Sequence, residues 1–249
     1  MKELAMEFRK IKRRKLWLTV AVMLGAQCLW GFWSFRNMDS QRLAQGFRLY
    51  LYHFPLLNAI MMPVIIAVVA SRLCDVEHKG QSLKLLQTVM PAGRLFDAKF
   101  LCGALHVTAA AVAQVIMMIV IGRIKGFLEP IPIDRFFFYL IFTTAVNLTI
   151  LVLQQVLSLL FVNQMVPLAV GLIGSFAGLF SMFFPQGFQK LILWGYYGVL
   201  MQVGMNWDKN TRIMDLYYVP FDWTGFLLLG ILFLVIYGAG RRIFAGKEL

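Results

Sequence analysis

Charged residues are scarce in this sequence of 249 residues, since Asp, Glu, Lys and Arg together make up only 14% of it. A soluble domain carries about 25% charged and about 45–50% apolar residues, whereas 60% of this chain is hydrophobic. A soluble fold would leave much of that apolar surface in water, and a disordered chain needs the opposite composition. The composition therefore predicts a membrane protein.

Cysteine and histidine are scarce too. The cysteines are Cys28, Cys74 and Cys102, and the histidines are His53, His78 and His106. Three cysteines inside or beside apolar runs exclude a disulfide scaffold and predict free buried thiols. No Cys or His spacing fits a metal site, so the chain is predicted to bind no metal.

Two motifs of catalytic or nucleotide-binding proteins are missing as well. No G-x-x-x-x-G-K-[ST] is present, so this chain does not hold a nucleotide in the P-loop manner. Ser175 stands in Gly-Ser-Phe-Ala-Gly, which is not the G-x-S-x-G of a serine hydrolase. The predicted membrane segments also lack acidic residues, which argues against an ion-coupled carrier.

The sequence does contain uncharged runs of about 20 residues, the length that crosses the hydrocarbon core of a membrane. They predict six transmembrane helices. The runs are 16–35, 49–71, 100–122, two within 136–189 separated at Asn163-Gln164 and Pro167, and 223–240. The segment 191–207 is rich in Gly, Trp and Tyr, and we expect it to be re-entrant or to lie at the outer surface.

The basic residues predict the orientation of the chain. Seven of the first 15 residues are Lys or Arg, and Arg241, Arg242 and Lys247 follow the last span. Because cytoplasmic flanks of membrane helices are enriched in Lys and Arg, both termini are predicted to be cytoplasmic. This topology also explains the net charge of +12 without nucleic-acid binding. We expect a multi-pass protein of the plasma membrane.

Two cytoplasmic segments have helical apolar spacing. In 1–15, Leu4, Phe8 and Ile11 share one face, which predicts an amphipathic helix in the membrane interface. In 75–99, a helix from about Gly80 to Met90 is expected, because Leu83, Leu86 and Met90 share one side and Pro91 ends it. A short amphipathic helix between two membrane hairpins is typical of a docking surface.

The order of these parts resembles the permease subunits of type-2 ABC exporters, the ABC-2 family. The stretch Glu77-His-Lys-Gly-Gln-Ser-Leu-Lys-Leu-Leu-Gln-Thr-Val-Met-Pro-Ala-Gly-Arg, followed by Lys99, is similar to the family's acid–Gly–small–Leu-x-Leu-Leu–Pro–Arg…Lys pattern. Two positions depart from it. Lys79 stands where the family often has a second acid or an Arg, and Phe96-Asp97 replaces a more usual apolar pair.

The resemblance implies an all-α, type V exporter-like permease fold, with residues 1–249 as one transmembrane domain. Within it, 1–15 is the elbow helix, 75–99 the cytoplasmic coupling segment and 185–220 the outer or re-entrant segment. It further implies a chain that is not itself an enzyme. ATP and Mg²⁺ would be bound by two copies of a partner ATP-binding subunit, and a second permease, the same or homologous, would complete the pore.

The resemblance also assigns roles to residues. The residues expected to couple to the ATPase are Asp75, Glu77, His78, Lys84, Leu85, Leu86, Val89 and Arg94. The residues expected at the translocation path or the contact between permeases are Asn58, Met61, Met62, Gly171, Gly174, Ser175 and Gly178. Gly174 and Gly178 form a G-x-x-x-G pair, which favours close helix packing.

The short length and the absence of a large outer domain look like those of lantibiotic-immunity permeases. The implied substrate is then an amphipathic compound, an antimicrobial peptide, moved by an exporter. Two other functions remain open from the residues alone. One is an intramembrane enzyme, and the other is a non-transporting membrane scaffold or sensor.

Overall fold

Helices dominate the computed structural model of this chain, which describes residues 2–12, 15–34, 36, 40–79, 90–207 and 214–246. The elements are α1 (Lys2–Lys12), α2 (Leu16–Ser34), α3 (Ser40–Leu43), α4 (Gly46–Lys79), α6 (Ala92–Ile124), α7 (Ile133–Leu160), α8 (Met165–Ser181), α9 (Gln186–Gln189), η1 (Leu193–Gly195), α10 (Tyr196–Val199), β1 (Val203–Trp207), β2 (Met214–Tyr218) and α11 (Trp223–Ala245). Five of the helices are long and apolar enough to cross a membrane, and α8 is a shorter apolar helix. The predicted all-α membrane fold is confirmed.

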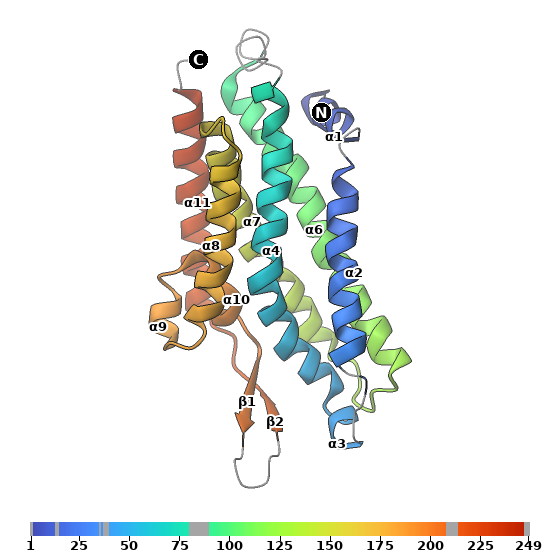
Figure 1. Cartoon of the computed structure of the whole chain (residues 1–249). Helices are drawn as coiled ribbons and strands as arrows, with labels where there is room; N and C mark the ends of the chain where they lie inside the picture. Colours follow the sequence, from blue (N-terminus) through green and yellow to red (C-terminus); the bar gives the residue numbers. More distant parts are fainter. Residues whose placement is uncertain are drawn as a thin grey trace.

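The six apolar helices α2, α4, α6, α7, α8 and α11 run side by side in one bundle (Figure 1). Helix α4 packs against α7 and α8, and α7 also packs against α6 and α11. The most apolar window of α4 is 67% buried, compared with 17% for α2 and for α11. Helix α4 is therefore the core of the bundle, whereas α2 and α11 present most of their apolar side chains outward, as lipid-facing helices do.

Both ends of the described chain lie at the same end of the bundle. Figure 1 shows α1 and the C-terminal end of α11 there, together with the end of α4 and the start of α6. The hairpin of β1 and β2 lies at the opposite end, near α3. The even number of membrane crossings predicted from the sequence fits this arrangement.

The uncharged run predicted as the second span ends at Ser71, and the helix α4 that contains it continues to Lys79. Leu73, Cys74 and Glu77 are buried, so packing holds these last two turns in the helix. With 34 residues α4 is about 51 Å long, well beyond the roughly 30 Å of hydrocarbon.

Helix α6 likewise starts earlier than the predicted span, at Ala92 directly after Pro91. The predicted segment 75–99 is therefore helical at both of its ends. The helix expected from Gly80 to Met90 lies almost entirely outside the described residues, which resume at Met90.

The segment 185–220 lies at the far end of the bundle and contains short elements. The longest helices among its described residues, α9 and α10, have four residues each, which is too short to cross a bilayer. The antiparallel hairpin of β1 and β2, in register from Val203↔Tyr218 to Trp207↔Met214, was not predicted. It is held by contacts distant in sequence, since Arg48 donates to Leu216 O (3.0 Å) and Leu216 N donates to Gln45 Oε1 (3.1 Å).

Helix α11 starts with a side-chain cap, Asp222, that is paired with Lys190 of this outer segment. Asp222 Oδ1 accepts the Gly225 N–H at 2.8 Å, and Asp222 Oδ2 lies 2.6 Å from Lys190 Nζ. Partial burial opposes ionisation of the carboxyl, but hydrogen bonds from Lys190, Thr224 and the Gly225 amide outweigh it and hold the pKa of Asp222 below its ordinary value.

We predict that Asp222→Ala destabilises the purified protein by about 1 kcal/mol at neutral pH, because the helix cap is lost. The loss is measured as a lower melting temperature. Because the pKa of Asp222 is lowered on folding, the stabilisation is complete above its unfolded value and is lost as the pH falls through the folded value. The gap between wild type and variant should therefore close in acid. Asp134→Ala, an acid in the first turn of α7 whose side chain is 70% exposed, is the control. A gap that widens in acid would contradict the assignment.

Candidate functional site

A ring of four charged side chains joins α1 to the neighbouring ends of α4 and α6. Lys10 Nζ lies 2.8 Å from Glu7 Oε1 and 2.9 Å from Glu77 Oε1. Lys99 Nζ lies 3.0 Å from Glu7 Oε2 and 2.8 Å from Glu77 Oε2. Each carboxylate therefore bridges both ammonium groups, and the signs of the charges alternate around the ring.

Three members of the charge ring are buried. The side chains of Glu77 and Lys99 are 0% exposed and that of Glu7 is 1% exposed, while Lys10 is 22% exposed. Lys99 also donates to the Leu73 carbonyl at 2.8 Å. An unpaired buried charge costs several kcal/mol, so these charged side chains can be buried only because they form ion pairs with one another.

Local structure brings the charge ring together. Glu7 and Lys10 are three residues apart and so share one face of α1. Glu77 lies in the last turn of α4, and Lys99 lies in the first turns of α6. The same side of α1 makes apolar contacts, because Ile11 is buried and the Phe8 ring stacks on His106 of α6 with centroids 5.6 Å apart.

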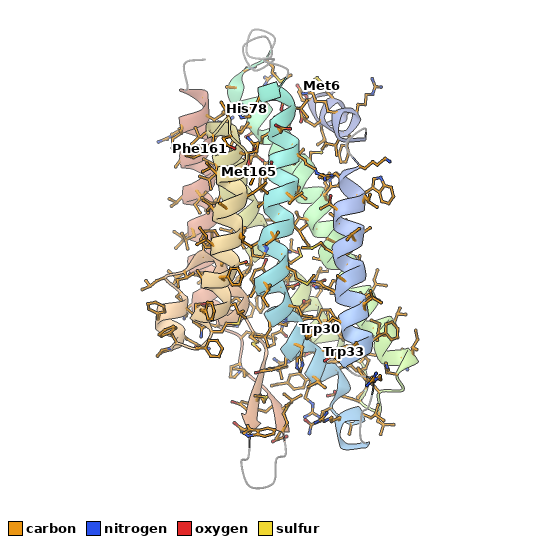
Figure 2. The ribbon with its side chains drawn as sticks, in the orientation of Figure 1. Met6, Trp30, Trp33, His78, Phe161 and Met165 are labelled. Atoms are coloured by element: carbon orange, nitrogen blue, oxygen red, sulfur yellow. The ribbon has the colours of Figure 1, made fainter. Side chains whose placement is uncertain are left out.

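The predicted coupling residues fall into three groups. Lys84, Leu85, Leu86 and Val89 lie outside the described residues. Glu77 belongs to the buried charge ring. Asp75 is half-buried, Arg94 is exposed, and His78 Nε2 lies 2.9 Å from the Ser158 carbonyl of α7. Figure 2 places His78 at the end of α4, near Phe161 and Met165 in the connection between α7 and α8. The roles of these residues at an ATPase stay predictions.

A second polar cluster lies inside the bundle, where α2, α4, α6 and α7 meet. Asn58 Nδ2 donates to Gln114 Oε1 (3.1 Å) and to the Tyr139 hydroxyl (2.8 Å). Gln114 Nε2 donates to Asn58 Oδ1 (2.8 Å) and to Gln27 Oε1 (2.9 Å). Tyr139 in turn donates to Gln114 Oε1 at 2.8 Å. The amide of Asn58, predicted to line the translocation path, is thus fully engaged within its own chain.

The other predicted path residues lie on α4 and α8. Met62 is buried and Met61 is half-buried. A Cβ at Gly171 would lie 2.6 Å from Cβ of Ala67 on α4, so this glycine lets α8 approach α4 closely. Ser175 is buried, and its hydroxyl donates to Leu172 O of the same helix.

The G-x-x-x-G pair packs inside this chain. A Cβ at Gly178 would lie 2.6 Å from the Trp194 carbonyl, and one at Gly174 would overlap the Trp194 indole. The pair therefore permits close packing, as predicted, but its partner here is the segment η1 and not a second helix. The opposite face of α8 carries exposed Ile173, Phe176 and Phe180.

Sequence reasoning missed the role of Glu7, Lys10 and Lys99 as one site. Glu7, one of two acids on a basic amphipathic helix, was a signal, since it is buried while its neighbour Arg9 is exposed. Gln27 and Gln114 stood out as polar residues in apolar spans, but spacing did not show that they meet Asn58. Among the described residues no three His, Cys, Asp or Glu side chains are placed to hold a metal ion.

A family model described as "ABC-2 family transporter protein" matches residues 3–178, which extend from α1 to the last turn of α8 and include the charge ring. No curated protein and no solved structure matches the chain.

The charge ring makes a prediction about stability. Lys99→Met leaves Glu7 and Glu77 with Lys10 alone, so an uncompensated negative charge is buried. We expect a loss of about 3–5 kcal/mol, measured as thermal or denaturant unfolding of the purified protein in detergent. Glu77→Gln should cost a similar amount, because it leaves a buried positive charge.

The double variant Glu77→Gln/Lys99→Met keeps the neutral pair of Glu7 and Lys10, and we expect it to be more stable than either single variant. Arg241→Met is the control, because Arg241 and Asp97 form an exposed ion pair (3.0 Å), and exposed pairs contribute little to stability. If the losses of the two single variants simply add, the four charges do not act as one ring.

Proposed function

The chain belongs to the ABC-2 family of transporter membrane proteins, and from this premise we propose that it is the permease of an ATP-driven exporter of amphipathic compounds. As a membrane component of this family it lacks ATPase activity and pairs with ATP-binding subunits. The observation that carries the proposal is the family match over residues 3–178, well over half of the chain.

The end of the bundle that carries α1 faces the cytoplasm in this proposal. The first 15 residues include seven basic ones, and Arg241 and Arg242 stand at the end of α11, at the same end of the bundle. Cytoplasmic flanks of membrane helices are enriched in Lys and Arg, which supports this orientation in the plasma membrane. The hairpin of β1 and β2 then faces outward.

The ATP-binding subunit, in two copies with ATP and Mg²⁺, docks on the segment 75–99. Both flanks of this segment are helical and reach beyond the hydrocarbon, and the charge ring anchors them to α1. Asp75, His78 and Arg94 stand at these flanks, and Lys84, Leu85, Leu86 and Val89 follow from the resemblance as the central contacts. Glu77 is buried, which favours an indirect role for it.

The proposed substrate is an antimicrobial peptide of the lantibiotic type, or a similar amphipathic compound. None of the six predicted spans contains Asp, Glu, Lys or Arg, which suits a carrier driven by ATP and an apolar cargo. An apolar groove of about 490 Å³ between α7 and α11, lined by Leu148, Phe226, Phe233 and others, opens on the side of the bundle. Such a groove would accept the apolar part of a compound that arrives from the bilayer.

A second permease, identical or homologous, is proposed to face α4 and α8. The glycine face of α8 is already covered by Trp194, so a partner would meet the side that carries Ile173, Phe176 and Phe180. Met61 and the exposed Ile60 of α4 would lie toward the same path. Aromatic and Met side chains suit an adaptable apolar path.

We predict that Leu86→Asp abolishes co-purification of the ATP-binding subunit and lowers ATP-dependent transport at least tenfold, because a charge replaces an apolar docking contact. The protein should still accumulate in the membrane. Leu128→Asp is the matched control, since Leu128 is 70% exposed at the opposite end of the bundle. Full transport by Leu86→Asp would reject the segment 75–99 as the docking element.

Thiol labelling tests the orientation. In a chain that lacks Cys28, Cys74 and Cys102, cysteines at the exposed positions Arg94 and Arg242 should react only after a membrane-permeant reagent is used. Cysteines at Leu128 and Tyr217 should react with an impermeant reagent added to intact cells. The reverse labelling pattern would show that the membrane topology is inverted, and the segment 75–99 would then be on the outside, where an ATP-binding subunit cannot dock.

A further inference from the structure

The charge ring has an electrostatic property that a simple anchor does not need. Two of its members, Glu7 and Lys10, belong to α1, and they pair with each other at 2.8 Å. The other two, Glu77 and Lys99, belong to α4 and α6, and they pair with each other at 2.8 Å. The ring therefore divides into two pairs that are each neutral, and the division runs between α1 and the rest of the bundle.

Separation of α1 from the bundle would thus leave no unpaired charge on either side. Two contacts across the division, Lys10–Glu77 at 2.9 Å and Lys99–Glu7 at 3.0 Å, would open. Removal of one partner from a buried pair is expensive because it strands a charge. Undocking avoids that cost, since every carboxylate keeps one ammonium group.

The backbone allows α1 to move apart from α2. Lys15, the residue between the described parts of the two helices, has φ +48°, a left-handed conformation that breaks the helix. Helix α1 packs against α6 and α4 rather than along α2. Its position is therefore set by the charge ring, by Ile11 and by the stack of Phe8 on His106.

The partner side of the charge ring lies at the base of the segment 75–99. Glu77 is two residues before the end of α4, and Lys99 is seven residues after the start of α6. A displacement of the segment between these helices would act first on the ion pair that closes its base. The charge ring is thus placed to link the position of α1 to that of the segment.

We propose that α1 is a releasable latch, which docks on α4 and α6 through the charge ring and undocks when the segment 75–99 is displaced. Glu77 and Lys99 are positioning residues in this mechanism and do not contact the ATPase. The latch rests on the proposed function, because the ATP-binding subunit supplies the displacement. A well-packed apolar contact would hold docked α1 at least as firmly as the four charges do. The use of charges is explained if α1 has to be released, because the charge ring separates into two neutral pairs.

The latch is tested first in the complex with the ATP-binding subunit, reconstituted in liposomes. Cysteines at Phe8 and His106, in a chain that lacks the native cysteines, are joined by a short bifunctional methanethiosulfonate. We expect ATP hydrolysis to fall at least tenfold and to return when dithiothreitol cleaves the link. The reference rate is that of the same double-cysteine complex before the reagent is added, and the reagent should leave the rate of each single-cysteine variant where it was before treatment. A cross-linked complex that hydrolyses ATP at the control rate would overturn the latch.

A second test uses the purified chain alone, so that a failure of the ATPase pairing does not decide it. Ile11→Cys lies at a position that is 5% exposed when α1 is docked, so its rate of reaction with a maleimide reports how firmly α1 is held. The double change Glu7→Gln/Lys10→Met should raise the Ile11→Cys rate at least tenfold, whereas Arg9→Met at an exposed position should not. An Ile11→Cys rate that the double change leaves as it was would show that the charge ring does not hold α1 and would reject the latch, whatever the chain transports.

Discussion

Polar groups inside a membrane bundle must find their partners within the protein, because hydrocarbon offers none. The two polar clusters of this chain obey that constraint in different ways. In mid-bundle, Asn58, Gln114 and Tyr139 exchange hydrogen bonds with Gln27 and tie four helices together. At the end that carries α1, four charges alternate in a closed ring. The positions of the other helices depend on these two sites and on α4, which contributes to both.

Helix α4 carries this double role because of its length. One of its polar residues, Asn58, lies in the mid-bundle cluster, and Glu77 lies in the charge ring, 19 positions and about 28 Å along the helix axis. A displacement at the end of α4 is therefore carried along a continuous helix that reaches the centre of the bundle. Pro55 and Pro63 interrupt its hydrogen-bond ladder near Asn58, which makes this region the natural place for a bend.

The outer end is assembled by packing instead of by charge. Trp194 fills the groove left by Gly174 and Gly178, and the hairpin of β1 and β2 rests on Arg48 and Gln45. These contacts close the bundle on that side and leave the aromatic face of α8 open. The molecule thus has a tightly packed outer end and, at the other end, an electrostatic contact that can separate into neutral halves.

The sequence by itself determined the membrane class and the positions of the apolar helices, because both depend on local composition. Contacts between distant residues decide two features that the sequence did not predict, the turns of α4 beyond Ser71 and the hairpin, whose strands are held by Arg48 of α4 and by Gln45 just before it. The candidate site was found in part. Glu77 was recognised from its motif, but its ion-pair partners Lys10 and Lys99 stand 67 positions before it and 22 after it. Only the packing of α1 against α4 and α6 brings these charges within 3.0 Å of one another, because burial, which no spacing reveals, requires every one of them to be paired.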